Sequence, residues 1–226
     1  MSAPARFDRL AQVYRWMEYF SFGPYLQQCR RLRLDEADSR HRALIYGDGD
    51  GRFLAELVRR APAIQATAVD ASAAMLHQTA RKLPGGSHVR LVHADALACE
   101  PAQFPEARFD LVVSHFFLDC FTEPEIELLL SRVQEAVYED TVWIVSDFAI
   151  PERAPAKQIA LLIVRGLYAA FGLLTGLTTH RLPDYGRLLQ KAGWRLEDRQ
   201  KLLFGLLASE RWRRGSSESK VPKNSW

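Results

Sequence analysis

The chain of 226 residues is long enough for one α/β domain, and its apolar and charged fractions, 48% and 25%, are those of an ordinary globular protein. A net charge of +3 and a pI near 8.8 are too weakly basic to indicate a nucleic-acid binder. Three scattered cysteines without a C-x-x-C motif, and an N-terminus without the apolar core of a signal peptide, predict a cytoplasmic protein with no structural metal.

The first segment, from Asp8 to Leu34, is dense in aromatic residues and has the pattern of one or two helices, broken by S-F-G-P at Ser21–Pro24. We expect residues 1–36 to form a helical lid over a main domain at 37–214. The remaining residues, 215–226, are polar and are expected to form a flexible tail.

Beyond the lid, short apolar runs alternate with helical patterns, which is typical of a doubly wound, mostly parallel sheet with helices on both faces. Ser72 and Thr122 are expected helix N-caps, and Glu125 completes a capping box with Thr122. The alternation changes after Pro155, and two extended runs around Gly205 fit a closing antiparallel pair. The predicted strands are 43–46, 65–69, 89–93, 109–114 and 142–146, and the predicted helices are 51–60, 72–82, 123–137, 156–174 and 183–192.

The most informative segment joins the first strand to the first helix and reads A-L-I-Y-G-D-G-D-G-R-F at Ala43–Phe53. Glycines let the backbone turn tightly and let a ligand touch it. The amides at the start of the new helix favour a negatively charged group. The second strand ends in Asp70, where a carboxylate is placed to accept hydrogen bonds from a ribose diol. Together these features predict a cofactor that contains adenosine.

The glycine spacing distinguishes between cofactors. A dinucleotide fingerprint needs a small residue where Arg52 stands, which argues against a nicotinamide-dependent oxidoreductase. The G-x-G-x-G spacing instead resembles the first motif of class I S-adenosylmethionine (SAM)-dependent methyltransferases, and the resemblance extends over about Phe7–Arg213. It implies a Rossmann-like sheet of seven strands with a reversed last strand, SAM as the cofactor, and methyl transfer to O, N or C of a small or amphipathic acceptor. Residues Phe7–Tyr14 resemble the N-terminal segment of the small-molecule and the quinone or lipid branch, whose tyrosine, here Tyr14, closes over the cofactor.

The resemblance also implies roles for single residues. Asp70 would hold the ribose, and Asp95 in H-A-D-A-L would meet the adenine amino group. Many members of the family carry an acid where Ile45 stands. Asp48 and Asp50 inside the loop could instead hold the cofactor's ammonium group, or could be turn residues only. The expected cofactor contacts are Tyr14, Gly47, Asp48, Gly49, Gly51, Asp70, Ala71, Met75, Asp95, Ala96 and Ser114.

The ends of the fourth and fifth strands are expected to face the methyl acceptor. His115 follows the fourth strand and Asp147 the fifth, so the two could approach each other. His115 would then remove a proton and Asp147 would set its tautomer. Alternatively, His115 bonds a loop backbone and Asp147 caps a turn. We expect Asp119 in a loop. The S-H-F-F run at Ser114–Phe117 differs from the Pro-Pro-aromatic motif of base and glutamine methyltransferases, which argues against a nucleic-acid substrate, and no histidine has metal-ligand spacing.

The stretch Ile159–Thr179 is almost wholly apolar and long enough to span a bilayer, although it contains Arg165. We expect a buried or substrate-covering helix, with a helix in the membrane interface as the alternative. His180 and Arg181 could bind an anionic acceptor or be solvated charges. Two other functions stay open: a phospholipid or isoprenoid-quinone methyltransferase in peripheral contact with a membrane, and a SAM-binding protein without catalysis. The sequence leaves the acceptor and the oligomeric state open.

Overall fold

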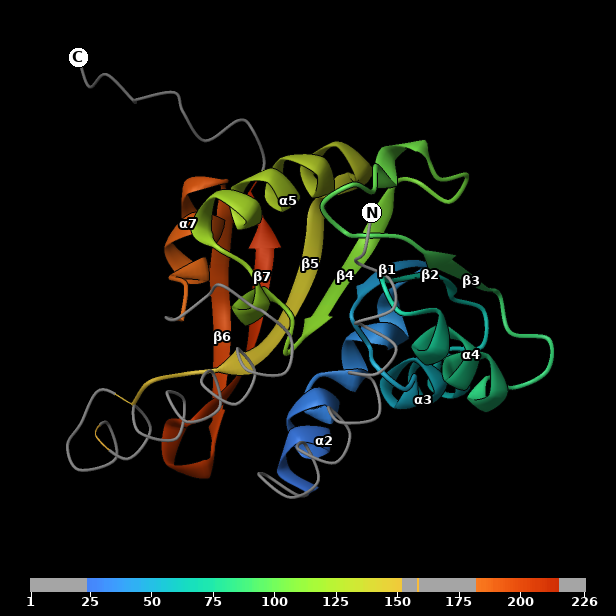
Figure 1. Cartoon of the computed structure of the whole chain (residues 1–226), viewed down its shortest axis with the longest axis horizontal. Helices are drawn as coiled ribbons and strands as arrows, with labels where there is room; N and C mark the ends of the chain where they lie inside the picture. Colours follow the sequence, from blue (N-terminus) through green and yellow to red (C-terminus); the bar gives the residue numbers. More distant parts are fainter. Residues whose placement is uncertain (1–23, 152–157, 159–181, 216–226) are drawn as a thin grey trace, which may run out of the picture.

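The computed structural model describes residues 24–151, 158 and 182–215. Within them the chain forms one seven-stranded sheet with the strand order β3-β2-β1-β4-β5-β7-β6 (Figure 1). The strands β1 to β5 are parallel, and β7 runs antiparallel to both β5 and β6. The strands are β1 (Arg42–Tyr46), β2 (Gln65–Asp70), β3 (Val89–His93), β4 (Phe109–His115), β5 (Val137–Phe148), β6 (Trp194–Leu202) and β7 (Leu207–Arg214).

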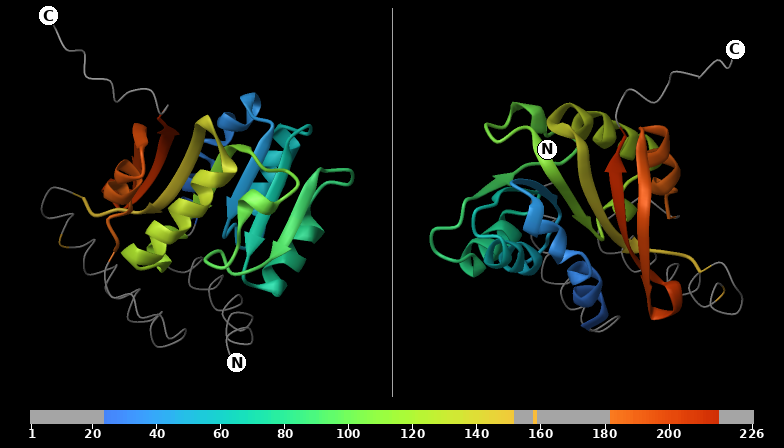
Figure 2. Two further views of the ribbon diagram at one scale, coloured as in Figure 1. Left: turned by 90° about the horizontal axis from the view of Figure 1, so that it is seen from above. Right: turned by 180° about the vertical axis from the view of Figure 1, so that it is seen from behind.

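Helices cover both faces of the sheet, as the doubly wound pattern predicts (Figure 2). On one face lie α2, α3 and α4, and on the other lie α5 and α7. The described helices are α2 (Pro24–Arg31), α3 (Arg52–Arg60), α4 (Ala73–Lys82), α5 (Glu123–Ala136) and α7 (Tyr185–Lys191), with short 3-10 turns η1 (Leu34–Ser39), η2 (Pro101–Gln103), η3 (Leu118–Cys120) and η4 (Leu203–Gly205).

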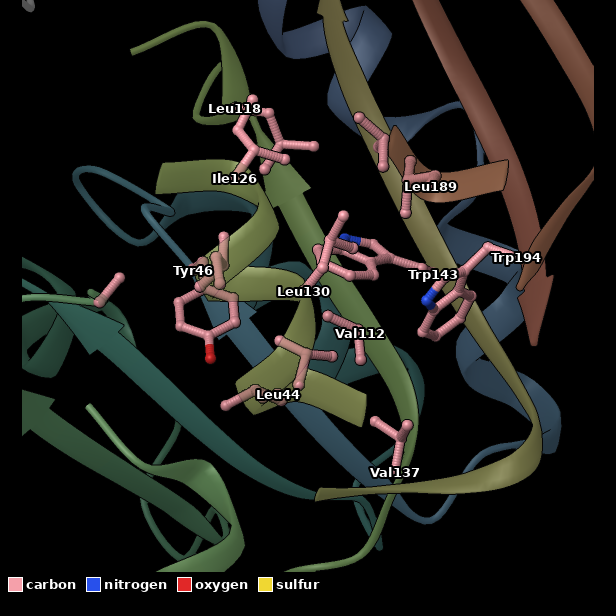
Figure 3. Packing of buried hydrophobic residues seen from close by; sticks show 14 of the residues in the cluster. Leu44, Tyr46, Val112, Leu118, Ile126, Leu130, Val137, Trp143, Leu189 and Trp194 are labelled. Carbon is pink, nitrogen blue, oxygen red and sulfur yellow. The ribbon is translucent and has the colours of Figure 1, made fainter. Parts of the chain in front are cut away.

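Each face of the sheet carries its own hydrophobic core, because successive side chains of a strand point to opposite faces. Leu44 and Val112 pack under α5 and α7, as Figure 3 shows, whereas Ile45 and Val113 pack under α3. The rings of Trp143 and Trp194 meet edge to face at 5.3 Å within the α5 and α7 core. Burying one such large side chain stabilises the fold by about 1.5–3 kcal/mol.

Local signals in the sequence set several element boundaries. The carboxylate of Glu125 accepts hydrogen bonds from the Thr122 backbone N–H at 2.8 Å and from its Oγ1 at 2.7 Å, which confirms the capping box of α5. Ser72 caps α4 by accepting from the Met75 N–H at 3.3 Å. The antiparallel pair around Gly205 is confirmed as β6 and β7.

The strand β5 is longer than predicted, because it begins at Val137 rather than near Val142. Its polar first part contains Asp140 at a φ of 65°, and the pairing with β4 shifts register near Phe109. A residue in the left-handed region and a polar sequence look like a turn, so alternation alone did not predict this part of the strand.

Several predictions fall outside the described residues. These are the first part of the helical lid, Tyr14, most of the predicted helix at 156–174, the apolar stretch Ile159–Thr179, His180 and Arg181, and the predicted tail beyond Gly215. In the part of the chain that the structure describes, no helix is both long and apolar enough to cross a membrane.

Candidate active site

The loop between β1 and α3 holds three glycines in the left-handed region, with φ of 61° at Gly47, 65° at Gly49 and 80° at Gly51. A Cβ added at Gly47 would lie 2.6 Å from the Phe117 ring, and one at Gly51 would lie 2.6 Å from the backbone of Thr79 in α4. Packing within the protein therefore explains these two glycines. A Cβ at Gly49 would meet no described residue within 4 Å, so within the described fold the backbone there borders open space that a ligand can enter.

The two acids of the loop have different surroundings. Asp50 is bound by Arg52 at 2.8 Å and by Lys82 at 2.6 Å, which ties the loop to both α3 and α4. Asp48 is buried, and its Oδ2 accepts from the Leu54 N–H at 2.9 Å, whereas its Oδ1 has no hydrogen-bond partner among the described residues. Burial raises the pKa of Asp48 to about 7. Of the two acids, Asp48 is the one with a buried acceptor that an ammonium group would satisfy.

Asp70 lies at the end of β2, where its Oδ1 accepts from the Ser72 N–H at 2.8 Å. Burial raises the pKa of this carboxyl group to about 6. The adjacent strand β3 ends at His93, which pairs with Asp70 and places its Nε2 3.0 Å from the Ala71 carbonyl oxygen. Neighbouring strand ends therefore bring Asp70 and Ala71 to the same edge of the sheet as the β1 loop.

The other predicted cofactor residues have varied surroundings. Asp95 is exposed and accepts from the Leu97 N–H at 2.9 Å, while Ala96 and Met75 are buried. The hydroxyl of Ser114 is buried and accepts from Trp143 Nε1 at 3.0 Å. The Ser114 side chain is thus engaged in the core, and its backbone lies between the paired strands β1 and β5.

His115 is buried at the end of β4, with its ring edge to face against Phe53 at 4.5 Å. Neither ring nitrogen has a hydrogen-bond partner among the described residues. Burial, helped by the nearby charge of Arg30, lowers the pKa of His115 well below its ordinary value. The imidazole is therefore neutral at neutral pH.

The expected approach of His115 to Asp147 is wrong. His115 pairs with Ser146 across β4 and β5, so the next residue along β5, Asp147, points to the opposite face. Asp147 instead meets Asp119: its Oδ2 accepts from the Asp119 N–H at 3.3 Å, and the two carboxyl groups are hydrogen-bonded to each other. Sequence reasoning missed this pair, because it depends on strand register and on the fold of η3.

The two carboxyl groups form a tightly coupled buried pair. Burial raises the pKa of Asp119 to about 6, and burial together with the charge of Asp119 raises the pKa of Asp147 well above its ordinary range. Cys120 adds a bond from its Sγ to Asp119 Oδ1 at 3.5 Å. At neutral pH the pair therefore holds a shared proton.

Aromatic side chains line the chain just beyond β4. Phe116 has a φ of 51°, and its ring lies against Phe148 at 5.4 Å between centroids. The guanidinium carbon of Arg30 lies 5.2 Å from the centre of the Phe116 ring. The end of β4 thus combines an apolar wall, a cation and the neutral imidazole of His115.

Known proteins share this architecture. Residues 43–140 match a family model described as a methyltransferase domain. An O-methyltransferase family protein from Burkholderia thailandensis is 16% identical with a TM-score of 0.65. The match covers 93% of this chain and 61% of that protein's chain. From the same organism, 1,6-didemethyltoxoflavin-N1-methyltransferase, solved with S-adenosylhomocysteine (SAH), is 17% identical with a TM-score of 0.64, covering 96% of this chain and 92% of its own. The N-methyltransferase NodS from Bradyrhizobium japonicum WM9, also solved with SAH, is 14% identical with a TM-score of 0.59, covering 87% and 89%.

No curated protein sequence matches the chain. The sheet order with its antiparallel β7 is nevertheless that of the Rossmann-like methyltransferase fold, and residues 43–140, which include the glycine loop, match a methyltransferase domain. The chain spans about 61% of the length of the O-methyltransferase family protein, so its own acceptor is a separate question.

Proposed function

We propose that the chain transfers the methyl group of SAM to O, N or C of a small organic molecule. The observation that carries this proposal is the open space at Gly49 together with the buried Oδ1 of the preceding residue, Asp48, which has no hydrogen-bond partner among the described residues. The loop thus combines room for a ligand with an acceptor for a cation, which suits the aminoacyl end of SAM.

Each of the neighbouring carboxylates suits one part of the cofactor. Asp48 would hold the ammonium group, a role that the buried Ile45 cannot fill at the family's usual acid position. Asp70 at the end of β2 would hold the ribose hydroxyls, and Asp95 after β3 would meet the adenine. When bound, SAM supplies a methyl group on a positively charged sulfur. The protein's task is then to position the acceptor and to take any proton it loses.

On the acceptor side, the aromatic wall of Phe116 and Phe148 would orient an organic molecule and exclude water. The neutral imidazole of His115 has two nitrogens without partners among the described residues, so it can accept a hydrogen bond or a proton from the acceptor. The Asp119–Asp147 pair lies on the other face of the sheet and would act separately, by anchoring the loop after β4 to β5.

Calorimetry tests the cofactor, and release of SAH tests the reaction. SAH should bind and NADH should not, and incubation with SAM should release SAH with at least one member of a panel of phenols, acids, amines and quinones. Binding of NADH without binding of SAH would overturn the proposal. If SAH binds but no SAH is released from SAM with any acceptor of the panel or with phospholipid vesicles, the result would favour a SAM-binding protein without catalysis.

A further inference from the structure

The hairpin between β6 and β7 presents a large apolar side chain to solvent in a strained conformation. Phe204, at its tip, is 94% exposed. Leu203 and Phe204 have φ of 48° and 55°, in the left-handed region that residues with a Cβ rarely occupy. The exposed ring gains almost no burial within the described fold to offset this strain. A tight hairpin turn needs positive φ at its central residues, here Phe204 and Gly205, so the turn accounts for the backbone conformation. The turn does not require a phenylalanine at the tip, and the exposed ring is the feature that points to a function.

The tip rests on a firm support. The Leu206 N–H donates to the Leu203 carbonyl at 3.0 Å, and the Ala149 N–H donates to the Leu206 carbonyl at 2.8 Å. A Cβ added at Gly205 would lie 3.5 Å from Pro151, so the hairpin lies directly against the chain that leaves β5. These contacts hold the Phe204 ring out from the protein.

An apolar cluster connects this tip to the acceptor end of the sheet. Its buried members include Phe116, just beyond β4, and Leu207 at the start of β7, while Leu203 and Phe148 pack against it from the edge. Phe148 pairs with Leu207 across β5 and β7. In Figure 1 the connection between β6 and β7 lies at the end of the sheet toward which β4 runs. Apolar side chains therefore lead from the exposed ring to the place where a methyl acceptor would bind.

One exposed basic residue lies near the tip. Lys201 is exposed three residues before Phe204, whereas Arg199 is ion-paired with the buried Glu210 at 2.6 Å. Ile150, beside the hairpin, is 38% exposed. An aromatic ring with a nearby lysine is suited to a bilayer interface, where the ring enters the headgroup region and the amine stays at the phosphates. One ring and one aliphatic side chain are too few for a stable protein interface, which buries about 800 Å² per partner.

We propose that the β6–β7 hairpin inserts Phe204 into the surface of an anionic lipid bilayer. The acceptor is then an amphipathic molecule that enters from the bilayer at the end of the sheet where β4 ends. This second statement rests on the proposed methyl transfer, whereas the membrane contact does not.

Flotation of the full chain with vesicles tests the contact. The chain should float with vesicles of phosphatidylcholine and phosphatidylglycerol, and Phe204→Ser should lower the partition constant, measured over a series of lipid concentrations, about tenfold, the effect of removing one buried aromatic ring. Tyr138→Ser is the matched control, because Tyr138 is also an exposed aromatic, 41% exposed, but lies near the start of β5 at the other end of the sheet. Tyr138→Ser should float like the parent.

A second variant tests insertion directly. In Phe204→Trp, brominated lipids should quench tryptophan emission more than in the parent, whereas Tyr138→Trp should show no added quenching. A parent that does not float, or Phe204→Ser that floats equally well, would overturn the proposal. The proposal would also be overturned if the chain self-associates without lipid and Phe204→Ser abolishes this association, because a second copy of the chain would then be the partner that covers Phe204. SAH binding is measured on the same samples. A chain that binds SAH but does not float with vesicles would contradict the hairpin proposal alone. A chain that floats with vesicles but does not bind SAH would contradict the proposed methyl transfer alone.

Discussion

His115 and Asp147 lie on neighbouring strands but point to opposite faces of the sheet, because His115 pairs with Ser146 and Asp147 is the next residue along β5. The acceptor end of the sheet therefore has two separate groups that handle protons. One is a neutral imidazole beside α3, and the other is a carboxyl pair between η3 and β5. They should respond to pH and to substitution independently.

The first prediction concerns Asp48 and compares two ligands. Asp48→Asn should weaken SAH binding by about 1.5–3 kcal/mol, the value of a hydrogen bond to a charged group. Binding of 5′-methylthioadenosine, which lacks the aminoacyl group, should stay unchanged. Asp50→Asn is the matched control, because Asp50 is occupied by Arg52 and Lys82. Asp50→Asn should either leave the affinities for SAH and 5′-methylthioadenosine unchanged or change both of them equally. Calorimetry that finds an equal loss for both ligands in Asp48→Asn would place Asp48 away from the ammonium group.

The second prediction separates occupied space from backbone strain at Gly49. Gly49→Val should abolish SAH binding and leave the far-UV spectrum unchanged. Gly86→Val is the control, since Gly86 also has a positive φ, 79°, and open space where a Cβ would stand, but lies in the loop before β3. Both variants should lose similar thermal stability from the strained backbone. Equal SAH affinity in the two variants would show that the β1 loop does not cradle the cofactor.

How much of this could be predicted from the sequence depends on how local each feature is. The glycine loop, the end of β2 at Asp70 and the Thr122 cap depend on neighbouring residues, and the sequence predicted where they lie in the fold. The contact between Asp119 and Asp147 depends on which face each strand position takes, and this requires the register of β4 against β5. The hairpin around Gly205 was predicted, but the left-handed backbone at Phe204 was not, because a residue with a Cβ rarely takes a positive φ.

The third prediction concerns the pH dependence of cofactor binding. Burial raises the pKa of Asp48 to about 7 and that of Asp70 to about 6, so both carboxylates take up protons as the pH falls from about 8 to about 5. A protonated Asp48 no longer attracts an ammonium group. SAH affinity should therefore fall over this range, and Asp48→Asn should flatten the upper part of the curve. Calorimetry at several pH values measures this, and a curve that stays level in the parent would contradict the assignment of both carboxylates.

The fourth prediction concerns stability and the carboxyl pair. The folded-state pKa values of Asp119 and Asp147 are raised, so their contribution to stability is full below the unfolded pKa of about 4 and is lost as the pH rises through the folded values. Asn at position 147 mimics the protonated carboxyl group. Asp147→Asn should therefore gain stability relative to the parent as the pH rises from about 5 to about 8.

Urea unfolding at the two pH values measures this gain. Glu127→Gln, which removes an exposed carboxylate of α5, is the control and should show no such gain. If Asp147→Asn loses stability equally at both pH values, the pair does not share a proton in the folded protein.

The last prediction concerns His115 as the group that takes the acceptor's proton. Burial lowers the pKa of His115, so the imidazole is neutral throughout the neutral range, and kcat should be level there and fall only at acidic pH. A weakly basic imidazole contributes at the lower end of the usual range for general bases, so His115→Ala should reduce kcat about 10²-fold and leave SAH affinity unchanged. His115→Asn, which keeps a hydrogen-bond acceptor without a basic nitrogen, should be as slow as His115→Ala. If His115→Asn is fully active, His115 orients the acceptor and the proton leaves by another route. If either variant loses SAH binding together with activity, His115 belongs to the cofactor side of the cleft, and the acceptor must be placed farther along the wall of Phe116 and Phe148.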